Sequence, residues 1–216
     1  MSYNYLPLDK NPTDFQQIKN LLAHGQLVSI TFDAHDRITK CRQYLDEKME
    51  NSDALFYGIN TGFGYLQNVQ IDKDQLQELQ CNLLKSHACG MGEEVPKDIV
   101  KLMMAFKIKS LSYGHSGVQT DTVERLMDMF NNDVLPVIYT QGSLGASGDL
   151  APLSHLSLPL IGLSEVYHAG VKMPAADALK KFGWQPIELK SKEGLALING
   201  TQFMTAYGLH NLIQCD

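Results

Sequence analysis

The chain has 216 residues, of which 44% are hydrophobic and 19% are charged, a balance typical of a soluble globular protein and unlike that of a disordered or collagen-like chain. Its 18 Lys and Arg residues stand against 24 Asp and Glu residues, giving a formal net charge of −6. Because proteins that bind nucleic acid neutralise its phosphates with a cationic excess, we expect no nucleic-acid partner.

The cysteines, histidines and apolar stretches indicate the compartment and exclude some classes of site. Four cysteines are scattered without a CxxC pair, as in proteins of a reducing compartment. The seven histidines show no HExxH or other ligand spacing, so we expect no metal. No basic and apolar leader opens the sequence, and its longest apolar stretch, around 156–163, is too short to cross a membrane. We therefore expect a cytoplasmic protein without membrane contact.

Segments of mixed character open the chain. The residues Thr13-Asp14-Phe15-Gln16 predict a capping box at the start of a short helix. Residues 27–32 alternate between apolar and polar as a strand does, and a helix over about 38–49 follows. Residues 54–57 predict another short strand, which runs into a glycine-rich loop. We assign residues 1–72 to a small mixed α/β N-terminal part.

From residue 73 onward the sequence predicts helix after helix, interrupted by one small hairpin over 166–173. The last helix follows Asn199-Gly200 and stops at Asp216 without a glycine, a proline or a cationic last turn, as a helix cut partway would. We expect a mainly α protein, in which residues 73–216 form the start of a helical body whose C-terminal half is missing. Apolar residues recur at helical spacing in the segments 76–83, 99–106, 123–130 and 150–161.

Three segments contain glycine and polar residues that packing alone does not require. The first, residues 57–64, has the sequence Tyr-Gly-Ile-Asn-Thr-Gly-Phe-Gly, whose three glycines indicate left-handed turns or close backbone approach. It lacks the third glycine of a dinucleotide-binding loop, which leaves a tight structural loop or a substrate loop as alternatives. Another of the segments, Asn199-Gly200-Thr201-Gln202, is by itself only a turn.

The remaining segment is Gly145-Ala146-Ser147-Gly148-Asp149, which has Asp149 where a nucleophile elbow requires glycine. The Gly148 amide nitrogen has no side chain beside it, so it can attack the Ala146 carbonyl carbon if the backbone folds back on itself. Loss of water from that ring, and then from Ser147, would leave an exocyclic methylene, an electrophile made from the chain itself. The alternative is an ordinary glycine-rich turn with Asp149 as the N-cap of the next helix.

Taken together and in this order, residues 57–64, 145–153 and 199–202 resemble the aromatic amino acid ammonia-lyases. The resemblance covers essentially the whole chain, but only the N-terminal portion of the family's usual length. It implies a mixed N-terminal domain followed by a long-helix bundle of the aspartase/fumarase-like type. It also implies a homotetramer in which each active site draws on several subunits.

The resemblance further implies a 4-methylidene-imidazol-5-one formed autocatalytically from Ala146-Ser147-Gly148, with no external cofactor. This electrophile removes ammonia from an aromatic amino acid, the small-molecule substrate. Tyr57 matches the tyrosine assigned as the base for the β-proton; since free tyrosine has a pKa of about 10, the site must favour the phenolate. Asn199 matches the asparagine beside the electrophile, with a helix-start cap as its alternative role. Gly64, in the Tyr57 motif, is assigned to substrate binding.

The choice of substrate depends on Ser86-His87-Ala88, which lies where family members select the side-chain ring. A Ser-His pair at this place resembles the pair found in histidine ammonia-lyases. The resemblance implies conversion of L-histidine to trans-urocanate and ammonia. The segment Ala151-Pro152-Leu153 and Gln202 favour the same substrate. His87 can equally bind a phenol hydroxyl, so a tyrosine ammonia-lyase or an aromatic 2,3-aminomutase is the nearby alternative.

Two more distant alternatives concern Ser147. A serine hydrolase would use it as a nucleophile, and a non-catalytic homologue would keep Ala-Ser-Gly as an unmodified turn. The family's C-terminal half supplies further tyrosine, arginine and glutamate side chains to the pocket. We therefore expect the 216-residue chain alone to be inactive.

Overall fold

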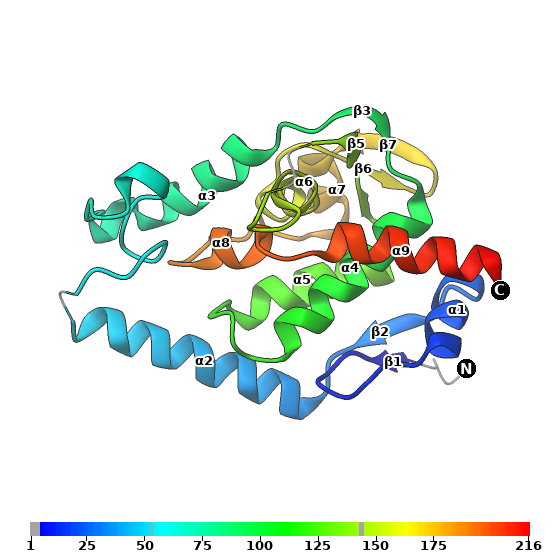
Figure 1. Ribbon diagram of the computed structural model, residues 1–216, viewed down its shortest axis with the longest axis horizontal. Coiled ribbons are helices and arrows are strands. Elements are labelled where there is room, and N and C mark those ends of the chain that lie inside the picture. The colour runs from blue at the N-terminus through cyan, green and yellow to red at the C-terminus, as the bar shows by residue number, and fades with distance from the viewer. Residues whose placement is uncertain (1–4, 53, 143–144) are drawn as a thin grey trace.

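A computed structural model describes residues 5–52, 54–142 and 145–216 and shows a chain formed mostly of helices (Figure 1). The expectation of a mainly α fold is confirmed. None of the helices in these ranges combines the length and apolar character needed to span a membrane. The helices are α1 (Phe15–Ala23), α2 (Phe32–Glu50), α3 (Leu76–His87), α4 (Lys97–Ser112), α5 (Thr120–Asn131), α6 (Leu150–Ser157), α7 (Ala175–Phe182), α8 (Glu193–Ile198) and α9 (Gln202–Cys215). Short 3₁₀ helices cover Gly64–Leu66, Lys73–Gln75 and Leu158–Ile161.

Short strands join segments of the chain that helices separate. The first two strands pair in parallel, the third pairs with the fifth in antiparallel fashion, and the other three form an antiparallel sheet in the order β4-β6-β7. The predicted hairpin is the β6–β7 pair. The strands are β1 (Tyr5–Pro7), β2 (Leu27–Ser29), β3 (Met91–Glu94), β4 (Leu135–Pro136), β5 (Tyr139–Gln141), β6 (Glu165–His168) and β7 (Val171–Pro174).

The start of the chain differs from the sequence-based expectation in two details. The capping box of α1 is formed by Asp14 and Gln17 rather than by residues 13–16: the Asp14 carboxylate accepts from the Gln17 amide at 2.8 Å, and the Gln17 side chain accepts from the Asp14 amide at 2.9 Å. The strand predicted over 27–32 ends at Ser29, because the Thr31 hydroxyl accepts from the Ala34 amide and begins α2.

The strand predicted over 54–57 is wrong. The Asn60 side chain accepts from the Phe56 amide at 2.7 Å and donates to the Ala54 carbonyl at 2.8 Å. These bonds supply locally the partners that a neighbouring strand would have offered. The segment is therefore irregular up to Tyr57, where a turn begins.

Helix α4 occupies the centre of the core and packs against α2, α5 and α9. It is buried on more than one face, as a helix surrounded by others must be. In Figure 1, α9 runs beside α4 and ends near α1, where Lys19 forms an ion pair of 2.7 Å with Asp216. The Asn199-Gly200 turn lies between α8 and α9.

Glu193, the first residue of α8, connects that helix to the start of α5. Its fully buried carboxylate accepts from the Gln119 amide at 2.9 Å and from the Gln119 side chain and the Thr122 hydroxyl at 2.7 Å each. The Lys190 amide donates a fourth bond at 2.8 Å. One carboxylate thus satisfies four donors that the core would otherwise leave unpaired.

We expect Glu193→Ala to lower the free energy of unfolding by about 3 kcal/mol, because it leaves these buried donors without an acceptor. Urea denaturation measures the loss. The matched control is Glu188→Ala, since Glu188 is exposed and contributes only its backbone carbonyl to Gln119. Its loss should stay within about 0.5 kcal/mol. Similar losses in the two variants would contradict the role given to Glu193.

Candidate active site

The segment 145–148 forms a tight turn that pairs with the Asn199-Gly200 segment. The Gly148 amide donates to the Gly145 carbonyl at 3.0 Å, which closes the turn, and the Asp149 amide donates to the Gly200 carbonyl at 2.7 Å. Gly148 bridges to both Gly145 and Gly200. Ala146 and Ser147 are exposed in the turn. Two of the predicted segments therefore meet through their backbones.

Gly148 occupies a position that only glycine fits. Its φ of +94° lies in the region that L side chains rarely adopt. A Cβ at this position would overlap the carbonyl oxygen of Gly200, a backbone atom that cannot turn aside as a side chain can. The turn and the Asn199-Gly200 segment are thus in contact with no space for a side chain between them.

Asp149 is buried and connects the turn to α9. It stands at the N-cap position of α6, but its side chain makes no capping bond there. Instead, its Oδ2 accepts from the Met204 amide at 3.0 Å, in the first turn of α9. A carboxylate at a helix N-terminus is favourable because it pairs an orphan amide and complements the helix dipole. Asp149 is thus the N-cap residue of α6 by position, as expected, but its side chain bonds to the first turn of α9 instead.

Asn199 is the C-cap residue of α8, and its side chain is exposed. The alternative role of a helix-start cap is wrong, because Thr201 is the N-cap residue of α9. The carbonyls of Ala196 and Asn199 both accept from the Nζ of Lys107, at 2.7 and 3.1 Å. Lys107 comes from α4, so the turn that carries Asn199 is held by the central helix.

Tyr57 and Gly64 lie together in the loop over 57–64. The Tyr57 hydroxyl is 3.5 Å from the Gly64 amide, which points its donor at the phenol oxygen, and 56% of Tyr57 is exposed. A Cβ on Gly58, whose φ is +68°, would come within 2.8 Å of the Leu195 side chain. The loop therefore packs against α8, the helix that ends at Asn199.

His87 is the last residue of α3, a helix that packs against α6 and α8. Its Nδ1 is 2.9 Å from the Leu83 carbonyl, and 3.1 Å from the Ser86 hydroxyl. A carbonyl only accepts, so this contact assigns the proton of the neutral ring to Nδ1 and leaves Nε2 as an acceptor. His87 can therefore receive a hydrogen bond from an N–H or O–H group.

His155 connects α6 to the segment that follows His87, a link that the sequence did not indicate. Its Nε2 accepts from the Gly90 amide at 3.0 Å, and its ring packs edge-on against Tyr139 at a centroid distance of 5.2 Å. Burial lowers the pKa of His155, which favours the neutral ring that this bond requires. The expectation that His155 is a helix residue is confirmed.

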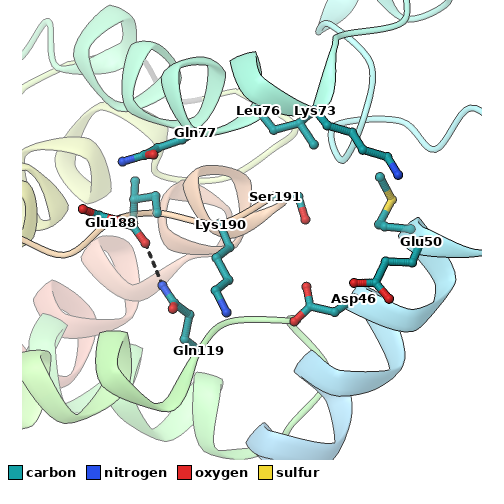
Figure 2. Close-up of a pocket in the computed structure, with 11 residues that line it drawn as sticks. Asp46, Glu50, Lys73, Leu76, Gln77, Gln119, Glu188, Lys190 and Ser191 are labelled. Atoms are coloured by element: carbon teal, nitrogen blue, oxygen red, sulfur yellow. Dashed lines mark hydrogen bonds between the residues drawn. The ribbon is translucent and has the colours of Figure 1, made fainter.

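Cavity size does not mark the predicted site. A cavity of about 330 Å³ is lined by Asp149, Pro152 and Met204 and by the aromatic rings of Phe203 and Tyr207. A larger one, about 530 Å³, lies between α2, α3 and residues 188–191 and contains none of the predicted site residues (Figure 2). Within the described ranges, no group of three or more His, Cys, Asp or Glu residues is arranged to hold a metal ion.

Residues 13–216 match the family described as aromatic amino acid lyase, and the chain belongs to that family. The histidine ammonia-lyase of Deinococcus radiodurans is 48% identical over 201 residues, which cover 92% of this chain and 38% of that protein.

Two solved structures of related proteins are similar in fold. Histidine ammonia-lyase from Trypanosoma cruzi gives a TM-score of 0.86 at 36% identity, over 96% of this chain and 40% of that one. Tyrosine aminomutase from Streptomyces globisporus gives a TM-score of 0.88 at 33% identity, over 95% of this chain and 38% of that one. The chain spans about two fifths of the length of these relatives.

Proposed function

We propose that this chain is the N-terminal portion of a histidine ammonia-lyase, which converts L-histidine to trans-urocanate and ammonia without oxidation. The observation that carries the proposal is the Ala146-Ser147-Gly148 turn held against Gly200, in a chain 48% identical to a histidine ammonia-lyase. The contact between Gly148 and Gly200 admits no side chain and requires a backbone conformation that few residues adopt. A turn that only reverses the chain does not need such a restricted conformation.

The cofactor of the proposed enzyme is a 4-methylidene-imidazol-5-one made from Ala146, Ser147 and Gly148. The Gly148 nitrogen bonds to the Ala146 carbonyl carbon, and the first water carries away that carbonyl oxygen with the amide hydrogens of Ser147 and Gly148. The second water takes the Ser147 hydroxyl and its Cα hydrogen. The chain reverses direction within the four-residue turn, which supports the proposal because this bond requires the backbone to fold back. No external cofactor takes part.

The predicted site residues outside the turn are assigned the remaining roles that this chemistry needs. The cofactor supplies an electrophile, so that the ammonium becomes a better leaving group and charge develops where the protein can stabilise it. Tyr57 takes the β-proton, and the Gly64 amide is a donor for the phenolate oxygen. The exposed Asn199 amide binds the cofactor oxygen or the substrate. The Nε2 of His87 accepts from the N–H of the substrate imidazole.

A tyrosine ammonia-lyase or an aromatic 2,3-aminomutase is the second candidate, favoured by two observations. The fold is as close to a tyrosine aminomutase, with a TM-score of 0.88, as to a histidine ammonia-lyase. The acceptor at His87 also suits a phenol hydroxyl. Turnover of L-histidine against L-tyrosine by the intact protein separates the candidates, with the 216-residue chain alone as the inactive control.

The intact mass of the denatured protein tests the proposed cofactor. We expect a mass about 36 Da below that of the sequence, the loss of two waters, which unfolding does not reverse. Ser147→Ala is the matched control: it has no hydroxyl to eliminate, so it cannot lose the second water and should never show the loss of about 36 Da. A full mass in the natural protein would contradict the proposal, and labelling of Ser147 by a fluorophosphonate would then support the hydrolase alternative.

The long-helix bundle of the aspartase/fumarase-like type and the homotetramer belong to the same proposal. Apolar residues of α9 support them, because Met204 is 51% exposed and Leu212 is 57% exposed. Such a face usually packs against another element. Further helices of the bundle, from the same chain or from neighbouring subunits, would cover it and complete the active site.

A further inference from the structure

Lys107 is a lysine in an unusual place. It is only 1% exposed, in the middle of α4, and forms no ion pair with any carboxylate in the described part of the chain. Burial lowers the pKa of Lys107 to about 7, since an ammonium loses its hydration in the core. A methionine would fill the same space without this cost, so stability alone does not explain a lysine here.

The amine of Lys107 binds one short piece of backbone. It donates to the carbonyls of Ala196 and Asn199, at the C-terminal end of α8. Helices leave their last carbonyls without partners, and a cation at that end is favourable. A neutral amine still has two N–H groups, so both bonds persist in either protonation state.

The backbone that Lys107 holds is the support of the 145–148 turn. The Asn199 carbonyl belongs to the peptide unit that precedes Gly200, and the Gly200 carbonyl accepts from the Asp149 amide at 2.7 Å. Gly148 leaves no space between the turn and Gly200. A small shift of Asn199 would therefore be transmitted directly to the turn.

We propose that Lys107 is a positioning residue for cofactor formation, which fixes the Asn199-Gly200 segment against which the Ala146-Ser147-Gly148 turn is held while it cyclises. The inference rests on the proposed function, because it concerns the step that makes the electrophile. Lys107 does not contact the reacting atoms. It acts through two backbone carbonyls, so its loss affects the yield or rate of cyclisation rather than the chemistry itself.

The test compares Lys107→Met with Lys109→Met in the intact protein. Lys109, two residues along the same helix, also donates to two backbone carbonyls, those of Asp9 at 2.8 Å and Asn11 at 2.5 Å. Lys109 therefore holds a different segment, residues 9–11, by the same kind of hydrogen bond. Denatured intact mass gives the fraction that has lost two waters, and urea denaturation gives the stability of each variant. We expect cyclisation at least tenfold slower in Lys107→Met and unchanged in Lys109→Met.

A second variant separates positioning from a general loss of folding. In Lys107→Ala, n-propylamine matches the three carbons and the amine that the substitution removes and can restore the two hydrogen bonds, whereas n-propanol of similar size carries a single donor. Cyclisation restored by the amine and not by the alcohol supports the inference. Equal restoration, or none, contradicts it.

The outcomes distinguish this inference from the proposed function. Full cyclisation in Lys107→Met, with the natural protein also cyclised, overturns the role of Lys107 and leaves the lyase proposal intact. A natural protein with its full sequence mass overturns the proposed cofactor and the inference with it.

Discussion

Gly148→Ala is expected to abolish cofactor formation, and with it the release of ammonia by the intact protein. The new Cβ would overlap the Gly200 carbonyl oxygen, and the φ of +94° is itself strained for alanine. The turn must then move away from Gly200, which removes the support on which cyclisation depends. We expect the full sequence mass and a fall in kcat/KM of about 10³-fold or more, since the electrophile is lost.

Gly145→Ala is the matched control for this prediction, because a Cβ at Gly145 would have no neighbouring atom of the described residues within 4 Å. It should lose two waters as the natural protein does. If Gly148→Ala cyclised to the same extent as Gly145→Ala, the close contact with Gly200 would not be required for the reaction.

Tyr57→Phe is expected to leave cofactor formation intact while it lowers kcat by roughly 10²- to 10⁴-fold, the range that a general base contributes. The substitution removes only the hydroxyl that lies 3.5 Å from the Gly64 amide and keeps the ring that packs edge-on against Phe63. KM should change little, because the lost interaction belongs to the transition state. The measurements are steady-state kinetics and the denatured intact mass.

Tyr65→Phe serves as the control, since Tyr65 follows the same loop and its side chain is fully exposed. Its kinetics should match those of the natural protein. Normal turnover by Tyr57→Phe would exclude Tyr57 as the base, and a full sequence mass would show that the tyrosine acts in cofactor formation instead.

Local patterns were sufficient to predict most of the helices, because their signal is the periodicity of apolar residues within one segment. The error over 54–57 has a local cause that the pattern hides: the Asn60 side chain bonds the backbone of Phe56 and Ala54 and replaces a strand partner. The capping box was predicted one residue too early for a similar reason. Asp14 and Gln17 have the same spacing as Thr13 and Gln16 and side chains that can make the same capping bonds, and the structure forms the box from Asp14 and Gln17.

In the candidate site, the motifs were predictable from the sequence, but the contacts between them were not. The Ala-Ser-Gly and Asn-Gly segments were visible as motifs, whereas their contact through Gly148 and Gly200 depends on packing between distant helices. Lys107 was missed because a lysine in a helical pattern ordinarily marks the solvent face. One signal was available: it stands directly between Phe106 and Ile108, inside an apolar run.

The hydrogen bond from the Met204 amide to the Asp149 carboxylate has a consequence for the order of events during synthesis on the ribosome. The carboxylate beside the turn has its helix partner only once Met204 has been synthesised and α9 has begun to form. A nascent chain that has emerged only as far as the turn lacks both that partner and Gly200. If the proposed cofactor forms, its reactive methylene would therefore be made late, inside a folded protein. A chain that is still unfolded would present no electrophile with which thiols could react.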